Sequence, residues 1–395
     1  MRQSVSIIGG GSSALLTAAF LDEKKFKVTI YEKNKALGRK FLVAGNGGFN
    51  LTHSEPISQL IERYTPNEFL KNALLNFDNQ DVRNWFNNIG IPTFIGSSKR
   101  VYPEKGIKPV AVFDAILNVL NKKSVKICYE QHWKGWNNKK ELIFNTDIFV
   151  KSDFVIFALG GGSWKVTGSD GDWLELFKNQ SIVVHPFQTS NCAYAVAWPN
   201  QFISQFEGSP LKNISISCAS KIQKGEVVLT RFGLEGNAIY ALSPQIRKEL
   251  QTNQVATIFL DLKPSLSVVE IHKKLNQSVE KNITERLRVS LKLNSSQISL
   301  LKAIISKENF LNLELLSESI KTLPITITGT APIDEAISTV GGIDLSEIDN
   351  HFQLIGLPNH YCIGEMLDYD APTGGYLLQS CFSMGVFVAK ELNNK

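Results

Sequence analysis

The hydrophobic and polar positions at the start of the chain follow the order strand, turn, helix and second strand. Residues 4–8 form a short β-branched run that stops at three consecutive glycines. Residues 14–21 then have helical spacing, and residues 27–31 form a second β-rich run that ends at Glu32. This order is typical of a βαβ unit with a glycine-rich first turn.

Helical spacing returns in residues 68–87 and 110–120, whereas residues 37–52 are glycine-rich and predict an irregular segment. Short apolar runs bounded by turn residues predict more strands. These strands are 125–129, 141–144 and 154–158. The first part of the chain is therefore predicted to be an α/β domain.

The pattern changes after about residue 186. Short alternating runs at 214–218, 226–230 and 255–260 predict a β-rich second domain. Residues 267–316 have long helical patterns with almost no Gly or Pro, which predicts a small helical insertion. After Pro324 the β-like runs return, and residues 380–392 predict a final helix.

Composition narrows the class of protein. A chain of 395 residues with 43% hydrophobic and 20% charged residues is long enough for two or three globular domains. Its net charge of +5 is too small to indicate a dedicated nucleic-acid binder. The five cysteines form no CxxC pair and the six histidines are dispersed, so we predict neither a disulfide framework nor a metal site.

No apolar stretch approaches the roughly 20 residues of a membrane span. The first apolar run is interrupted at residues 9–13 and lacks a small-residue cleavage site, which disfavours a secretory signal. We therefore expect a cytoplasmic protein that does not insert into membranes.

The first chemical motif is Gly9-x-Gly11-x-x-Ala14. Gly9 permits a tight turn, Gly11 lets the backbone approach a pyrophosphate, and Ala14 allows close packing of helix on sheet. Glu32 is placed to accept hydrogen bonds from ribose hydroxyls, which favours FAD or NAD over NADP. The other predicted contacts around this turn are Ser12, Ser13 and Lys33.

The second motif is a glycine-rich loop soon after Glu32. Its exposed backbone donors suit the second half of a long dinucleotide, which favours FAD, and Arg39 and Lys40 are candidates to neutralise the diphosphate. The alternative is a surface loop with unrelated charges. The predicted cofactor contacts are Gly38, Arg39, Lys40, Gly45, Asn46, Gly47, Gly48, Asn50, Leu51 and Thr52.

A third motif lies near the other end of the chain. Glu365 follows a predicted strand, where its carboxylate could hold ribityl hydroxyls, and Gly374 and Gly375 begin the last helix, where backbone N–H groups could stabilise a reduced flavin. The predicted contacts from this region and from the glycine run after residue 158 are Gly161, Glu365, Gly374, Gly375, Tyr376 and Leu377.

These segments resemble the HI0933-like family of bacterial NAD(P)/FAD-dependent flavoproteins. The resemblance covers residues 8–14, 32, 38–52, 154–171, 227–243 and 364–379, and a subgroup is indicated by residues 47–54 and 96–103. The chain departs from the family at Gly48 and Phe49, where the larger family usually carries an Arg or Phe followed by Cys, and at Leu159, where a threonine is usual. We therefore assign no cysteine redox chemistry.

The resemblance implies an α/β fold in which a Rossmann-type, glutathione-reductase-like FAD domain carries an inserted β-barrel-like domain with a nested helical domain. With the changes of pattern described above, it gives three domains. They are the FAD domain (1–187 and 335–395), the β-rich domain (188–265 and 322–334) and the helical insertion (266–321).

It also implies an FAD-dependent NAD(P)H oxidoreductase in which hydride passes from flavin N5 to a conjugated C=C or similar electron-poor acceptor. FAD would be bound non-covalently. We expect NAD(P)H to be a transient donor, because the glycine run 160–162 is followed by a predicted strand, 181–184, without a ribose-binding acid. The acceptor would be a small molecule or a nucleobase, and no obligate protein partner is indicated.

Three alternatives stay open. The first is a flavin-dependent enzyme that reduces uridine in RNA, with a basic rim at 33–40 and the aromatic Trp133 and Trp136 as a binding face. The second is a non-catalytic flavin-bound interaction protein that docks through residues 267–316. The third is a peroxide-forming oxidase.

Residues that would complete the reaction are less constrained by pattern. Asp368 and Tyr376 are candidate catalytic proton donors, and Arg100 and Tyr102 are candidate substrate contacts. A structural or cofactor-positioning role is the alternative for each of the four.

Overall fold

The computed structural model describes residues 1–43, 49–145 and 147–395. It divides into two compact units, and each is described by itself. Unit 1 comprises Met1–Thr189 and Ile333–Lys395, and unit 2 comprises Ser190–Pro332. The three predicted domain boundaries stay a prediction.

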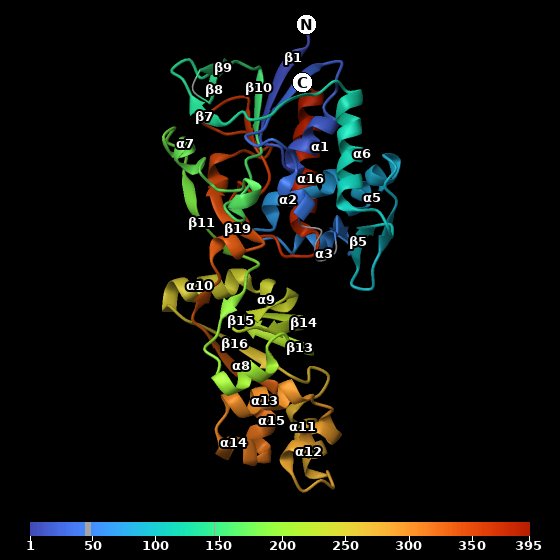
Figure 1. Cartoon of the computed structure of the whole chain (residues 1–395), viewed down its shortest axis with the longest axis vertical. Coiled ribbons are helices and arrows are strands. Elements are labelled where there is room, and N and C mark those ends of the chain that lie inside the picture. The colour runs from blue at the N-terminus through green and yellow to red at the C-terminus, as the bar shows by residue number, and fades with distance from the viewer. Residues whose placement is uncertain (44–48, 146) are drawn as a thin grey trace. The chain divides into compact units, whose positions relative to one another are not determined.

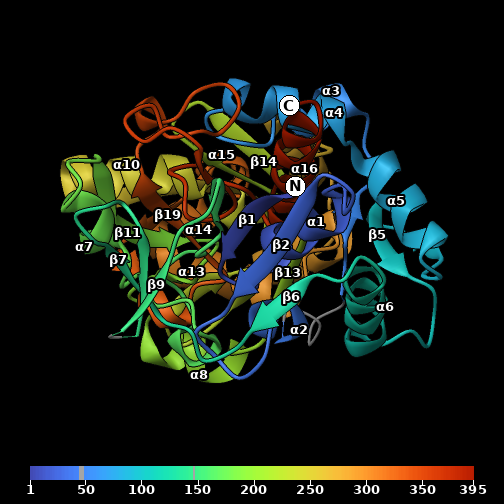
Figure 2. The same ribbon diagram turned by 90° about the horizontal axis from the view of Figure 1, so that it is seen from above.

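Unit 1 is built on a parallel five-stranded sheet in the order β20-β10-β1-β2-β6. The central strand β1 (Gln3–Ile8) pairs with β2 (Phe26–Tyr31) on one side and with β10 (Phe154–Phe157) on the other. Near-continuous apolar runs suit strands that are covered on both faces. In Figure 2, β1 and β2 lie side by side with α1 next to them.

The first and last helices pack directly on each other. In Figure 1, α1 (Ser12–Phe20) and α16 (Tyr376–Asn393) lie side by side, and α6 (Pro109–Lys122) lies on the other flank of α1. A Cβ atom at Gly385 of α16 would lie 2.6 Å from the carbonyl oxygen of Ser13 and 2.8 Å from Thr17 Oγ1. The missing side chain at Gly385 is what permits this spacing.

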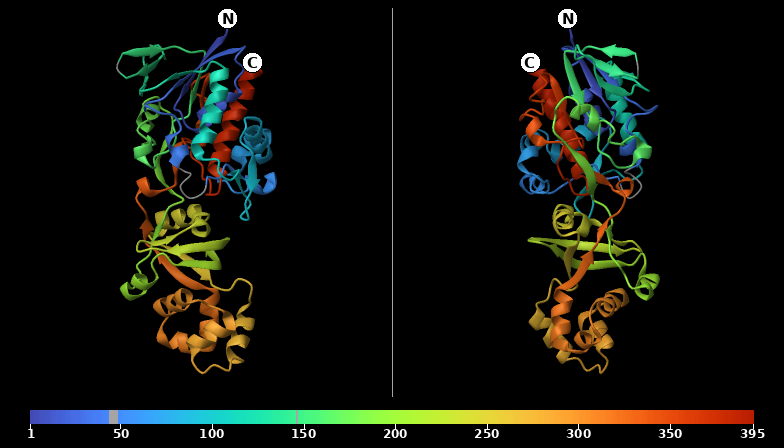
Figure 3. Two further views of the ribbon diagram at one scale, coloured as in Figure 1. Left: turned by 45° about the vertical axis from the view of Figure 1, so that its right-hand side comes forward. Right: turned by 90° about the vertical axis from the view of Figure 1, so that its left-hand side faces the viewer.

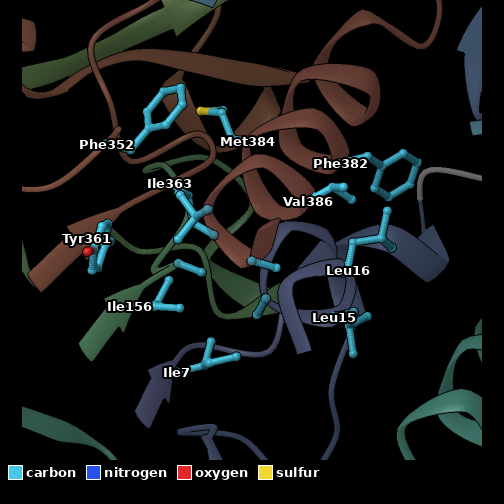
Figure 4. Close-up of a cluster of buried hydrophobic side chains, with 14 of the residues drawn as sticks. Ile7, Leu15, Leu16, Ile156, Phe352, Tyr361, Ile363, Phe382, Met384 and Val386 are labelled. Carbon is cyan, nitrogen blue, oxygen red and sulfur yellow. The ribbon is translucent and has the colours of Figure 1, made fainter. Parts of the chain in front are cut away.

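The core of unit 1 fills the space between these helices and the sheet. Figure 4 shows one cluster formed by Ile7, Ile156, Leu16, Phe382 and Val386. All five side chains are fully buried. Because they come from both ends of the sequence, this core forms only when the two ends meet.

The remaining elements of unit 1 surround this centre. They are α2 (Arg39–Val43), β3 (Thr52–His53), α3 (Ile57–Ile61), α4 (Lys71–Asn76), α5 (Asn79–Asn88), β4 (Thr93–Ile95), β5 (Arg100–Pro103), β6 (Lys126–Cys128), β7 (Trp133–Trp136), β8 (Leu142–Phe144), β9 (Ile148–Val150), α7 (Leu174–Lys178), β11 (Val184–Ser190), β19 (Ser338–Ile343) and β20 (His360–Cys362).

Two predicted elements are wrong in detail. The predicted helix 68–87 is broken, because Asp78 accepts hydrogen bonds from the backbone N–H groups of Gln80 and Asp81 and so begins a new helix, α5. The predicted strand 181–184 is also displaced. Strand β11 begins only at Val184, after the positive-φ residue Ser181.

Unit 2 contains a seven-stranded antiparallel sheet in the order β17-β16-β13-β14-β15-β12-β18. Strands β16 (Ala256–Asp261) and β17 (Leu323–Ile327) pair directly, and residues 268–321 between them form helices. Figure 3 shows these helices (orange) as one cluster beside the strands.

The other elements of unit 2 are β12 (Tyr194–Ala195), α8 (Asn200–Phe206), β13 (Pro210–Cys218), β14 (Lys221–Leu229), β15 (Gly233–Glu235), α9 (Asn237–Tyr240), α10 (Ser243–Asn253), α11 (Val268–Asn276), α12 (Ile283–Leu291), α13 (Ser295–Ile304), α14 (Lys307–Leu311), α15 (Leu313–Lys321) and β18 (Gly329–Thr330). In the described parts of the chain, no helix is long and apolar enough to span a bilayer.

The contact between α1 and α16 can be tested with Gly385→Ala. Alanine is the better helix former, yet its methyl group would press on Ser13 and Thr17. We expect the variant to lose about 1–3 kcal/mol of unfolding free energy, measured by urea denaturation. Gly356→Ala, where an added Cβ meets nothing described within 4 Å, should change stability little. Equal stability of both variants would contradict the close packing.

Candidate cofactor site

The turn after β1 combines two crowded glycines with one open glycine. Gly9 has φ +100°, and a side chain there would clash with the carbonyl of Ala158. Gly10 is similarly enclosed by Leu37 and Glu32. Gly11 is exposed and has an extended backbone that any residue adopts, and a Cβ there would meet no described atom within 4 Å. The chain's own packing therefore does not require glycine at Gly11.

Glu32 braces this turn from the end of β2. Its Oε2 accepts a hydrogen bond from Gly10 N at 2.8 Å. Its Oε1 accepts two hydrogen bonds from Asn34, one from the backbone N–H and one from the side-chain amide, each at 2.8 Å. The carboxylate is 8% exposed. Since it has about four acceptor positions, it keeps capacity for a ribose hydroxyl.

Gly38 attaches the next segment to the same turn. Its N–H donates to the carbonyl of Gly10 at 2.9 Å, and its positive φ of +63° places its Cα against the ring of Phe113. Helix α2 then begins, which carries Arg39 and Lys40. The predicted contacts Gly45, Asn46, Gly47 and Gly48 lie outside the described residues.

Lys40 enters a buried polar cluster at the carboxyl edge of the sheet. Its Nζ donates to Glu365 Oε2 at 2.9 Å and to Ser163 Oγ at 2.9 Å. Glu365 Oε1 also accepts from Thr339 N at 3.0 Å. Gly161 is enclosed here, because a Cβ would clash with the Thr339 hydroxyl.

The first and third motifs meet at this edge. A side chain at Gly364 would clash with the hydroxyl of Ser13, the second residue of α1. Cys381 of α16 lies at the same place, and burial raises the pKa of its thiol. The two ends of the chain thus form one contiguous site.

The second motif meets the start of α16. A Cβ at Gly375 would lie 2.7 Å from Thr52 Cα and 2.8 Å from the Asn50 amide nitrogen. The Thr52 hydroxyl donates to Gln379 Oε1, and Leu51 is fully buried. Leu377 packs against the core at this first turn of α16.

An ion pair between the buried Glu55 and the partly exposed Arg63 lies at this junction, and pattern reasoning missed it. Glu55, whose side chain is 3% exposed, receives a two-pronged contact from Arg63 (3.1 and 2.8 Å) and a hydrogen bond from the Tyr376 hydroxyl (2.7 Å). His53 stacks on the Tyr376 ring with centroids 5.2 Å apart. The hydrogen bond from Tyr376 to Glu55 joins the segment after β3 to α16.

Ionisation in this cluster follows from burial and partners. Burial disfavours the charged form of Glu55, but hydrogen bonds from Arg63 and Tyr376 outweigh it, so the pKa of Glu55 is lowered. Burial raises the pKa of Tyr376, and the adjacent carboxylate raises it further. Burial lowers the pKa of His53.

The two predicted proton donors are engaged with protein groups. The Tyr376 hydroxyl donates to Glu55, and Asp368 Oδ1 accepts from Gly341 N at 2.8 Å. These contacts favour a positioning role over the predicted catalytic role. Of the predicted substrate contacts, Arg100 lies beside Gly374, with Nε 3.3 Å from a Cβ placed there, whereas Tyr102 stacks on Phe94.

Two of the predicted cofactor contacts also bond protein groups, and their roles at the cofactor stay predictions. Lys33 pairs with Asp170 at 2.6 Å, and Arg39 donates to Asn34 and to the carbonyl of Val166, so both cations point to other protein groups. Trp133 and Trp136 form no base-stacking face. They pack edge to face within the core of unit 1, and Trp133 is 3% exposed.

The five-stranded parallel sheet with its glycine-rich first turn defines a Rossmann-type α/β fold of the kind that binds FAD, which confirms the predicted fold class. A family model described as the HI0933-like protein Rossmann domain matches residues 3–391. The chain belongs to this family, and the resemblance noted from the motifs is confirmed.

Two relatives align over nearly their whole length. The chain is 23% identical to a 3-dehydro-bile acid delta(4,6)-reductase of Clostridium scindens and 24% identical to a ribosomal RNA dihydrouridine synthase of Haemophilus influenzae, with 98% of each chain covered in both cases. A solved 3-ketosteroid delta1-dehydrogenase of Sterolibacterium denitrificans has a TM-score of 0.50 at 11% identity, with 100% of both chains covered. At that identity the likeness concerns the fold alone.

The Glu55 ion pair predicts a pH-dependent stability. Arg63→Leu leaves a buried carboxylate without its cation and should cost about 1–3 kcal/mol at pH 7, measured by urea denaturation. Because the pKa of Glu55 is lowered from 4.5 in the folded chain, this stabilisation is present above pH 4.5 and is lost as pH falls through the folded pKa. The difference from wild type should therefore shrink in acid.

Arg83→Leu is the matched control, since Arg83 bonds only neutral side chains among its described contacts, Thr93 and Gln80. Its effect should be small and nearly independent of pH. A pH-independent deficit in Arg63→Leu would contradict the ion-pair account.

Proposed function

We propose that the protein binds FAD in unit 1 and acts as an FAD-dependent oxidoreductase. The observation that carries this proposal is the open position at Gly11. Within the described chain, neither packing nor backbone conformation requires a glycine at this position. A pyrophosphate that approaches the backbone closely does require one, because a side chain would collide with it.

The residues around Gly11 fit the rest of such a cofactor. The amino end of α1 suits the pyrophosphate, since its N–H groups and dipole favour an anion. Glu32 would take the adenosine ribose, and Glu365, held by Lys40, would take ribityl hydroxyls. Gly374 and Gly375, beside Asn50, would lie at the pyrimidine end of the flavin.

Bound FAD supplies hydride transfer, from NAD(P)H as a transient donor to an electron-poor carbon of the acceptor. The chain contributes position and charge to this chemistry. Glu365 and Lys40 neutralise each other in the buried cluster, and Glu55, which pairs with Arg63, accepts a hydrogen bond from Tyr376 in the first turn of α16. Arg100, at Gly374, offers a cation to a carbonyl or phosphate of the acceptor.

Reduction of a conjugated carbon–carbon double bond is the reaction we propose. One relative is named for a delta(4,6)-reductase and the other for the formation of dihydrouridine. Reduction of a double bond is implied by both names, so a steroid-like enone and a uridine in RNA are the two acceptor classes to compare.

Gly11→Val tests the cofactor assignment. The valine side chain meets no described protein atom and suits the extended backbone, so the variant should fold with wild-type stability. FAD affinity should fall at least about 10-fold, or about 1.4 kcal/mol, measured by equilibrium dialysis. Gly356→Val, at another open glycine, should keep FAD. Wild-type affinity in Gly11→Val would place the pyrophosphate elsewhere.

The activity is tested by anaerobic titration. NADH or NADPH should bleach the bound flavin, and addition of a 4-ene-3-keto steroid or a uridine-containing ribosomal RNA fragment should restore its visible absorption. If only one of the two acceptors reoxidises the flavin, that result identifies the class of acceptor. Absence of any bleaching would favour the non-catalytic interaction protein. Rapid peroxide formation in air would favour the peroxide-forming oxidase.

A further inference from the structure

The chain passes from one unit to the other twice, and the strands next to these two crossings pair in one small sheet. The chain leaves unit 1 after Thr189, at the end of β11, and re-enters it at Ile333, shortly before β19. Strands β11 and β19 pair with each other in a two-stranded sheet. Any coupling between the cofactor site and the crossings has to pass through this sheet or through the loops around it.

The segment that carries Glu365 bonds alternate amides of β19. Glu365 Oε1 accepts from Thr339 N at 3.0 Å, and Asp368 Oδ1 accepts from Gly341 N at 2.8 Å. Ile343 N then donates to the carbonyl of Met366 at 2.9 Å. Two of these three acceptors are side chains, so the position of β19 depends on where those carboxylates are held.

Strand β19 packs closely against its neighbours. A Cβ at Gly341 would lie 2.5 Å from the carbonyl of Pro186 in β11, and one at Gly342 would clash with the carbonyl of Met366. Thr339 Oγ1 also accepts from Gly162 N at 3.1 Å. A shift of Glu365 would therefore be transmitted to β19.

We infer that Thr339 and Asp368 are positioning residues that couple the cofactor site to strand β19. The inference rests on the proposed FAD site. A cofactor that bonds Glu365 restricts that carboxylate and, through it, the Thr339 amide. Asp368 accepts from the Gly341 amide, so the two carboxylates hold β19 at Thr339 and at Gly341. Because coupling is reciprocal, loosening β19 weakens cofactor binding.

Hydrogen exchange measured by mass spectrometry tests this coupling. In the wild-type protein, saturating FAD should slow amide exchange in residues 338–343. Asp368→Ala removes the acceptor for Gly341 N, so it should reduce that FAD-dependent slowing and weaken FAD binding about 5-fold or more. Asp368→Asn keeps a carbonyl oxygen and should restore both.

Asp153→Ala is the matched control, because Asp153 also accepts from a backbone N–H, that of Ser4 at 2.7 Å, at the opposite edge of the sheet. It should leave the exchange of 338–343 and the FAD affinity unchanged. Thr339→Val removes the hydroxyl that accepts from Gly162 N at 3.1 Å and donates to Glu365 Oε1 at 3.5 Å, so it should also reduce the FAD effect. This variant replaces Asp368→Ala if that one does not fold.

The outcomes separate the two proposals. If FAD binds but leaves exchange in 338–343 unchanged, or if Asp368→Ala and Thr339→Val both keep the full FAD effect, the coupling is wrong and the proposed function stands. If the wild-type protein takes up no FAD, the proposed function is overturned, and this inference with it.

Discussion

The direct packing of α1 against α16 is the constraint on which unit 1 depends. Gly385 lets the two helices touch where any side chain would hold them apart, and Gly364 does the same beside Ser13. Residues from the two ends of the sequence therefore share one core and one sheet edge. The segment after β20, which carries Gly364 and Glu365, lies against the first turn of α1 in the same way.

Charge at the site is balanced locally. Lys40 and Glu365 pair inside the polar cluster, Arg63 and Glu55 pair beneath α16, and Lys33 pairs with Asp170. Burial makes an unpaired charge costly, and each of these three acids is matched by a cation. The pairs Lys40–Glu365 and Lys33–Asp170 also join distant parts of the chain.

Sequence patterns predicted the parts of this arrangement that depend on local chemistry. The turn at residues 9–14, Glu32 at a strand end and glycines before α16 each have a local steric or electrostatic reason. Thr339, Ser163 and Glu55 had no such signal, because each bonds a partner far away in the sequence. Arg63 had none either, because its role depends on Glu55. The hypothesis of a binding face at Trp133 and Trp136 is wrong for a different reason: the composition of a segment does not tell which face of a strand is buried.

The pairing of β16 with β17 has a consequence for the variability of unit 2. Leu260 lies opposite Leu323, and adjacent antiparallel strands can be joined by a turn of only two residues. Topologically, the whole helical segment is thus an extended hairpin loop. A change in the length of this segment therefore leaves the register of the two strands in the sheet unaltered, because the strands pair with each other directly.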